Sequence, residues 1–137
     1  MVKTYKKQQG DWISDHFISD EFDCPCDGKC TTTLIDTDLI EKLEAVRKAL
    51  GKALRINSGY RCQAYQDELR LRGYETSSGV STHTLGKAAD IMCEGVTGVS
   101  LEEVARASGF RAVGVGSNFI HVDTRNDRDR RWSYNRG

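Results

Sequence analysis

The sequence of 137 residues is 38% hydrophobic and 29% charged, which is the ordinary composition of one soluble globular domain. Its 20 basic and 20 acidic side chains balance to a formal charge of zero, so net charge gives no argument for a nucleic-acid partner. No apolar run approaches the length of a membrane-spanning helix, which argues against membrane insertion. We therefore predict a single domain over residues 1–137.

Residues 1–35 show little hydrophobic periodicity and predict a mostly irregular arm. His16 lies in this arm and is interpreted as a packing or surface histidine rather than a ligand. Five large apolar residues are expected to hold the arm on the core: Trp12, Ile13, Phe17, Ile18 and Phe22.

Three of the five cysteines, Cys24, Cys26 and Cys30, lie in this arm, whereas Cys62 and Cys93 stand apart. Three cysteines at this spacing can begin a structural zinc site, although no histidine lies close in sequence to complete it. One or two disulfides, or reduced thiols in a cytoplasmic protein, are the alternatives. We favour a structural link, by disulfide or metal, between the cluster and Cys62.

Residues 37–50 form the clearest predicted helix. Apolar residues recur there every three or four positions, and charged residues fill the other face. Asp36, Thr37 and Asp38 can cap the start of the helix, and Gly51 favours its end.

A short strand is predicted from Ala53 to Asn57, and a second helix from Gln63 to Arg72. The turn between them contains Gly59 and then Arg61, whose guanidinium offers a planar fork for a carboxylate or a developing oxyanion. The alternative for an isolated arginine is a surface salt bridge. The loop at 74–80 is expected to form part of a substrate cleft.

Residues 81–91 place His83 seven residues before Asp90, with glycine and small residues between them. One imidazole and one carboxylate are two of the three side chains that commonly hold a catalytic zinc ion. The third candidate is His121, which lies in an alternating run that predicts a strand. A loop histidine and a surface aspartate are the alternative interpretation of the first pair.

The C-terminal part predicts a helix begun by a capping box at 100–103 and a hairpin of strands at 112–115 and 119–124. In the second strand, Ile120 and Val122 suit the core. The opposite face carries His121 and Asp123 and is free to line a site. The Arg-rich end at 126–137 predicts a solvated tail.

Three motifs now stand in order: Ser-Gly-Tyr-Arg at 58–61, Ser-x-His with its later Asp at 81–90, and Phe-Ile-His-Val-Asp at 119–123. Together they resemble peptidase family M15, the zinc D-Ala-D-Ala carboxypeptidases, and especially its phage- or prophage-associated branch and related murein endopeptidases. The resemblance covers roughly residues 17–132.

The resemblance implies an α+β fold shared with the signalling domain of hedgehog proteins, in which a small antiparallel sheet with flanking helices carries the metal. It implies one catalytic Zn²⁺ bound by His83, Asp90 and His121. It also implies that Arg61 assists substrate binding and transition-state stabilisation, and that Ser81 helps to bind the carboxyl terminus of the substrate.

One position departs from the family pattern. Several branches place Glu or Asp three residues before the last histidine ligand, whereas this sequence has Asn118, which cannot act as a base. Asp123 is the nearest substitute in sequence for the catalytic carboxylate. Alternatively, Asp123 orients the imidazole of His121.

The prediction is therefore a zinc-dependent peptidoglycan peptidase that uses a zinc-activated water. The expected activity is that of a D,D-carboxypeptidase or an endopeptidase on stem or cross-link peptides. We expect a monomer that acts at the bacterial cell wall, for example as an endolysin. The N-terminus lacks a secretory signal, so lysis or phage machinery would release the enzyme, unless a leader is missing from the chain.

Two alternatives remain open. The first is a catalytically impaired, zinc-containing cell-wall binding module, which Asn118 supports. The second is a cysteine-dependent enzyme that uses Cys62 or Cys93, which leaves Asp90 and Arg61 unexplained.

Overall fold

The computed structural model describes residues 1–74 and 80–134, which fold as an α+β protein. The helical elements are α1 (Thr37–Leu50), α2 (Gln63–Leu71), α3 (Gly98–Ala107) and the 3-10 turns η1 (Ser19–Phe22) and η2 (Thr82–Leu85). The strands are β1 (Val2–Lys6), β2 (Thr32–Asp36), β3 (Arg55–Ser58), β4 (Ala88–Met92), β5 (Ala112–Val115), β6 (Ile120–Asp123) and β7 (Arg130–Ser133).

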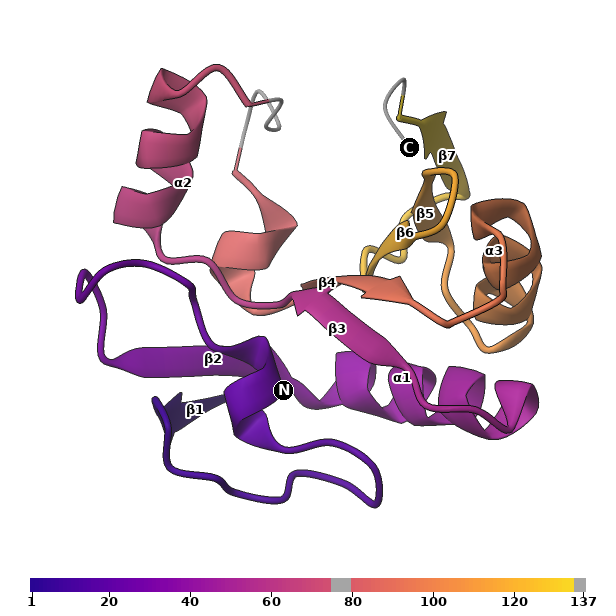
Figure 1. Ribbon diagram of the computed structural model, residues 1–137, viewed down its shortest axis with the longest axis horizontal. Helices are drawn as coiled ribbons and strands as arrows, with labels where there is room; N and C mark the ends of the chain where they lie inside the picture. The colour runs from indigo at the N-terminus through magenta and orange to yellow at the C-terminus, as the bar shows by residue number, and fades with distance from the viewer. Residues whose placement is uncertain (75–79, 135–137) are drawn as a thin grey trace.

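The larger sheet has five strands in the order β3-β4-β6-β5-β7, and β1 pairs with β2 in a separate sheet. All pairs are antiparallel except β5 with β7. Figure 1 shows α2 on one side of the molecule and β5, β6 and β7 on the other, with β3 and β4 between them. The predicted fold class is confirmed.

The two faces of the five-stranded sheet have different roles. Alternate residues of β4 and β6, among them Ile91, Ile120 and Val122, are fully buried in one apolar core with residues of α1 and α3. Because successive side chains of a strand point to opposite faces, Asp90 and His121 project from the other face. Packing in the core therefore fixes the positions of β4 and β6, the strands that carry Asp90 and His121.

Helix α1 forms over the predicted residues. The carboxylate of Asp36 accepts a hydrogen bond from the Asp38 amide at 3.4 Å, and Gly51 ends the helix with φ of +66°. Leu43 and Val46 on its apolar face are completely buried. Periodicity and caps agree here, so the sequence was sufficient to place this helix.

The predicted irregular arm at 1–35 is wrong at both ends, because β1 and β2 lie there. Strand β1 is almost entirely exposed, so it lacks the apolar alternation by which a strand is recognised in sequence. Of the expected anchors, Phe17 and Phe22 are buried, whereas Trp12 is 71% exposed.

The predicted solvated tail at 126–137 is also wrong over β7, which pairs with the edge of β5. Trp132 of this strand packs directly over Gly114, where any side chain would collide with the indole. This polar segment is therefore ordered by pairing with β5, which has a glycine opposite Trp132. The sequence of the segment itself does not predict a strand.

Helix α3 begins earlier than the predicted capping box at 100–103. Thr97 is the N-cap and accepts a hydrogen bond from the Ser100 amide at 3.2 Å. None of the helices in the described part of the chain is long and apolar enough to cross a membrane.

Candidate metal centre

The structure brings His83, Asp90 and His121 together from η2, β4 and β6. The Asp90 Oδ1 atom lies 3.4 Å from His83 Nε2 and 3.1 Å from His121 Nδ1. One ligand atom from each residue lies within 4.8 Å of the other two. These are the three residues that the sequence predicts as metal ligands.

Strand register explains two members of this set. Asp90 and His121 are directly paired across β4 and β6, on the face away from the core. Side chains at directly paired positions of an antiparallel sheet have Cβ atoms about 5 Å apart, so both side chains can reach a common point. A shift of one residue would turn one of them into the core.

His83 is positioned by the turn η2 and by a backbone carbonyl. Ser81 Oγ caps the turn by accepting from the His83 amide at 3.3 Å, and Gly86 ends it with φ of +73°. The His83 Nδ1 lies 2.7 Å from the Gly59 carbonyl oxygen. Since a carbonyl only accepts, Nδ1 carries a proton, and Nε2 is the ring nitrogen that faces Asp90.

His121 is held through its other ring nitrogen. Its Nε2 lies 2.8 Å from Asp123 Oδ2 and donates its proton to that carboxylate, which leaves Nδ1 facing Asp90. Asp123 is completely buried, and Arg125 donates to both of its oxygens at 2.9 Å. These contacts turn Asp123 toward the imidazole and away from the solvent-accessible side of the centre.

Burial and charge act against each other at the three candidate ligands. Burial raises the pKa of Asp90, but hydrogen bonds from His121 and His83 outweigh it and hold that pKa well below its usual range. Burial lowers the pKa of His83, and the hydrogen bond and charge of Asp90 oppose this shift without cancelling it. Burial also lowers the pKa of His121, but hydrogen bonds to Asp123 and Asp90 reverse the effect and raise it.

Arg61 lies beside the three candidate ligands. Its Nη2 donates to Asp90 Oδ2 at 3.2 Å, and its Nε donates to Ser58 Oγ at 3.0 Å. Its backbone amide donates to the His83 carbonyl at 3.2 Å. The ion-pair partner of Arg61 is therefore a predicted ligand and not a remote surface carboxylate.

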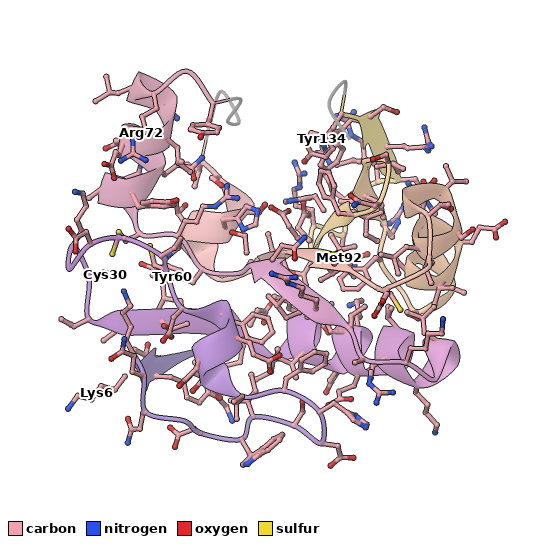
Figure 2. All side chains as sticks on the ribbon, viewed as in Figure 1. Lys6, Cys30, Tyr60, Arg72, Met92 and Tyr134 are labelled. Carbon is pink, nitrogen blue, oxygen red and sulfur yellow. The ribbon has the colours of Figure 1, made fainter. Side chains whose placement is uncertain are left out.

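A cavity of about 770 Å³ opens over this centre. The three candidate ligands line it together with Ser81 and Arg61. Aromatic residues form one wall, and Figure 2 labels one of them, Tyr134, beside the C-terminal strands. Four further arginines line the cavity: Arg125, Arg128, Arg130 and Arg131. Of the predicted cleft loop at 74–80, Val80 lines the cavity, and residues 75–79 lie outside the described residues.

The remaining histidine and cysteines lie outside this cavity. His16 is exposed, and its Nδ1 pairs with Glu44 at 2.6 Å. Cys93 is buried in the apolar core. Cys62 approaches Cys24, but their sulfur atoms are 3.7 Å apart, well beyond the disulfide length of about 2.05 Å. All five cysteines are free thiols, so the link to Cys62 is not a disulfide in this structure.

The sequence matches the model of a known protein family. A family model described as Peptidase M15 matches residues 15–123, which is most of the chain and includes Arg61 and all three candidate ligands. No curated protein matches the chain.

Proposed function

The chain belongs to the peptidase M15 family, and on this premise we propose that it is a zinc-dependent peptidase of bacterial peptidoglycan. Its substrates would be the stem or cross-link peptides of the wall. The observation that carries the proposal is the convergence of His83, Asp90 and His121 beneath an open cavity.

The three residues fit a catalytic zinc ion. Two imidazole nitrogens and one carboxylate oxygen are a donor set that zinc prefers, and three protein ligands leave one position free. Each imidazole is held through its other nitrogen, His83 by the Gly59 carbonyl and His121 by Asp123. Such partners fix the tautomer and orientation of a metal-bound histidine.

When bound, zinc would supply an activated water and polarise the scissile carbonyl. The chain's own contribution is charge and position. The Arg61 guanidinium, about one-fifth exposed beside Asp90, can donate to an oxygen on which negative charge develops. Ser81 lines the cavity while its hydroxyl also holds the His83 amide, so it can meet the substrate near the centre.

The contacts of Asp123 support an orienting role rather than that of a general base. Both of its oxygens are engaged by His121 and Arg125, and its side chain has no exposure to the cavity. Among the described residues, Asp129 is the carboxylate that lines the cavity outside the ligand set. Asp129 is therefore the first candidate to test as the proton acceptor.

The walls of the cavity favour a peptide that carries carboxylates. Five arginines line it, against the acidic residues Asp90 and Asp129. Excess positive charge raises the local concentration of anionic ligands. Peptidoglycan stem peptides end in a carboxylate and carry further acidic groups, so they match this charge. We propose that the enzyme acts as a monomer at the bacterial cell wall, as an endolysin or other member of the phage-associated branch.

The test is digestion of purified peptidoglycan by zinc-loaded protein, with mass spectrometry of the products. Release of D-alanine would identify a carboxypeptidase, and cleavage of cross-linked dimers an endopeptidase. We expect a chelator and His83→Ala to abolish either product. His16→Ala, which changes a histidine outside the cavity, is the matched control and should retain activity.

A specific observation also favours a second candidate, a wall-binding module without turnover. Asn118 stands where several branches carry a carboxylate, and Asp123 is already engaged by His121 and Arg125. Wall binding by the zinc-loaded protein, with no hydrolysis across a panel of muropeptides, would support this candidate and contradict the peptidase.

A further inference from the structure

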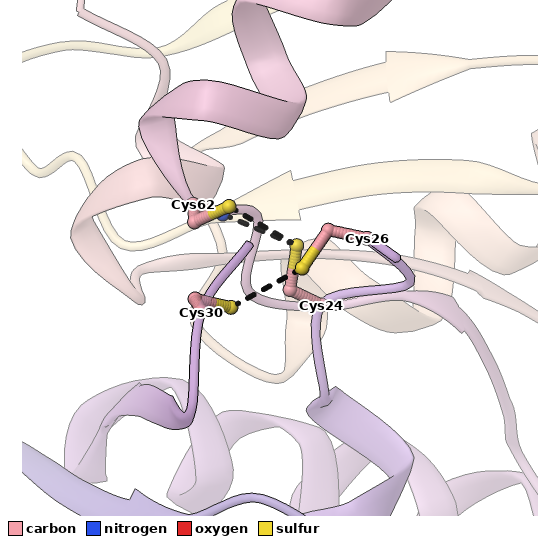
Figure 3. A group of neighbouring side chains, drawn as sticks. All are labelled: Cys24, Cys26, Cys30 and Cys62. Carbon is pink, nitrogen blue, oxygen red and sulfur yellow. Dashed lines mark hydrogen bonds between the residues drawn. The ribbon is translucent and has the colours of Figure 1, made fainter. Parts of the chain in front are cut away.

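Four cysteines that do not line the cavity converge on one point. Cys24, Cys26 and Cys30 lie in the segment between η1 and β2, and Cys62 is the N-cap of α2. One Sγ from each lies within 4.8 Å of all the others. Figure 3 shows the four Cβ–Sγ bonds directed toward one another from two separate parts of the chain.

The spacing of the sulfur atoms matches shared coordination of a metal. Cys24 and Cys62 have Sγ atoms 3.7 Å apart, and those of Cys26 and Cys30 are 3.5 Å apart. Zinc bound at about 2.3 Å to four sulfurs in a tetrahedron would separate them by about 3.8 Å. Two disulfides would require about 2.05 Å within each pair.

One ammonium group and one backbone N–H contact the sulfurs. Lys7 places its ammonium group 3.6 Å from Cys26 Sγ and 3.7 Å from Cys30 Sγ. The Cys62 amide donates to Cys24 Sγ at 3.3 Å. A zinc ion with four thiolates carries a net charge of about −2, and a nearby ammonium and an N–H donor both stabilise that charge.

We propose that Cys24, Cys26, Cys30 and Cys62 bind a structural zinc ion, separate from the ion proposed at the cavity. Four protein ligands complete the tetrahedron and leave no position for water, as in structural rather than catalytic zinc sites. Cys62, from a distant part of the sequence, is the fourth ligand beside the three cysteines of the arm. It uses none of the residues proposed for hydrolysis.

This site would fasten the arm to the segment that carries Arg61. The Tyr60 amide donates to the Phe22 carbonyl at 2.9 Å, just before the first cysteine, and Gly59 accepts from His83. Cys62 follows Arg61 directly. The zinc would therefore hold the arm and the 59–62 segment together.

The experiment is metal analysis of the full chain purified under reducing conditions. We expect about two zinc ions per wild-type chain and about one in Cys30→Ser. The double variant His83→Ala/His121→Ala should also keep about one, because the cysteines are unchanged. Cys93→Ala is the matched control, since Cys93 lies in the apolar core, and it should keep the wild-type zinc content.

Substitution of cobalt for zinc identifies the ligand atoms of the same site from its absorption spectrum. Cobalt bound to the double histidine variant should show the intense sulfur-to-cobalt charge-transfer bands of a tetrahedral thiolate centre, and Cys30→Ser should lose them. This measurement also decides the matter if Cys30→Ser fails to fold, because the histidine variant retains all four cysteines.

Two results would overturn the proposal. One is a double histidine variant that binds neither zinc nor cobalt through thiolates. The other is a Cys24–Cys62 or Cys26–Cys30 disulfide found by mass spectrometry in the protein purified under reducing conditions. Failure of peptide hydrolysis alone would contradict the proposed function and leave this site standing.

Discussion

The two clusters of metal-binding residue types in this chain are built on different supports. In the His83–Asp90–His121 centre, Asp90 and His121 lie on one face of a sheet whose other face packs in the apolar core, and η2 supplies His83. The four-cysteine cluster is carried by a loop and by the start of α2. The first offers three ligands beneath a cavity, and the second offers four with no cavity residue among them. Ligand number and access thus separate a centre suited to reaction from one suited to holding the chain together.

The largest effect is expected from a substitution that removes a ligand of the His83–Asp90–His121 centre and leaves the four cysteines unchanged. His121→Ala removes a ligand supplied by the sheet, so we expect peptide hydrolysis to become unmeasurable. The chain should still fold, because the core face of β6 is unchanged. Hydrolysis assays beside circular dichroism check this. Activity equal to that of wild type would show that His121 is not a ligand.

A smaller effect separates reaction from metal binding at the same centre. Arg61→Ala removes a donor beside Asp90 without removing a ligand, so we expect kcat to fall by about 10²- to 10³-fold. Zinc content should be unchanged. Steady-state kinetics with metal analysis tests this, and Arg61→Lys tests whether charge alone suffices. An unchanged kcat in Arg61→Ala would remove Arg61 from the mechanism.

The next effect concerns Asp123, the carboxylate that holds the imidazole of His121. Asp123→Asn should weaken zinc binding and activity by about 10- to 100-fold, because the imidazole loses its charged partner. Asp123 also helps to raise the pKa of His121, so its loss lowers that pKa. Competition between zinc and the proton on His121 should then shift to lower pH.

Zinc titrations across a range of pH measure both parts of this prediction. A variant with normal zinc affinity but no hydrolysis would instead identify Asp123 as the general base. Asp129→Asn is the comparison for zinc affinity, since Asp129 lines the cavity and its carboxylate accepts a hydrogen bond from Arg111.

The smallest effect concerns the rim of the cavity. Arg128 is exposed there, so Arg128→Ala should raise KM for an acidic muropeptide a few-fold and leave kcat unchanged. The increase should shrink at high salt, because salt screens interactions between exposed charges. Michaelis–Menten measurements at two ionic strengths check this. An equal KM at low salt would show that Arg128 does not attract the substrate.

The sequence was informative wherever local patterns and burial agree. Helix α1 forms over the predicted residues 37–50, and the hairpin of β5 and β6 matches its predicted strands closely. Alternation placed Ile120 and Val122 in the core and left His121 on the other face. The resemblance to the family rested on short motifs that survive in linear order, and the family model confirms it.

Other features depend on partners that are far away in sequence. Strands β1 and β7 are ordered by pairing with β2 and β5, and neither has a clear apolar alternation of its own. The earlier start of α3 depends on Thr97, a cap that lies before the apparent capping box.

By itself, the sequence determined which residues have the chemistry to bind zinc: His83, Asp90, His121 and the cysteines. Only the tertiary structure decided their geometry. Strand register set Asp90 opposite His121, and the Gly59 carbonyl and Asp123 fixed which imidazole nitrogen faces Asp90. The same structure brought Cys62 to the arm. The physical reason is that residue type fixes what a side chain can bind, whereas distances between remote side chains are fixed by long-range pairing and packing.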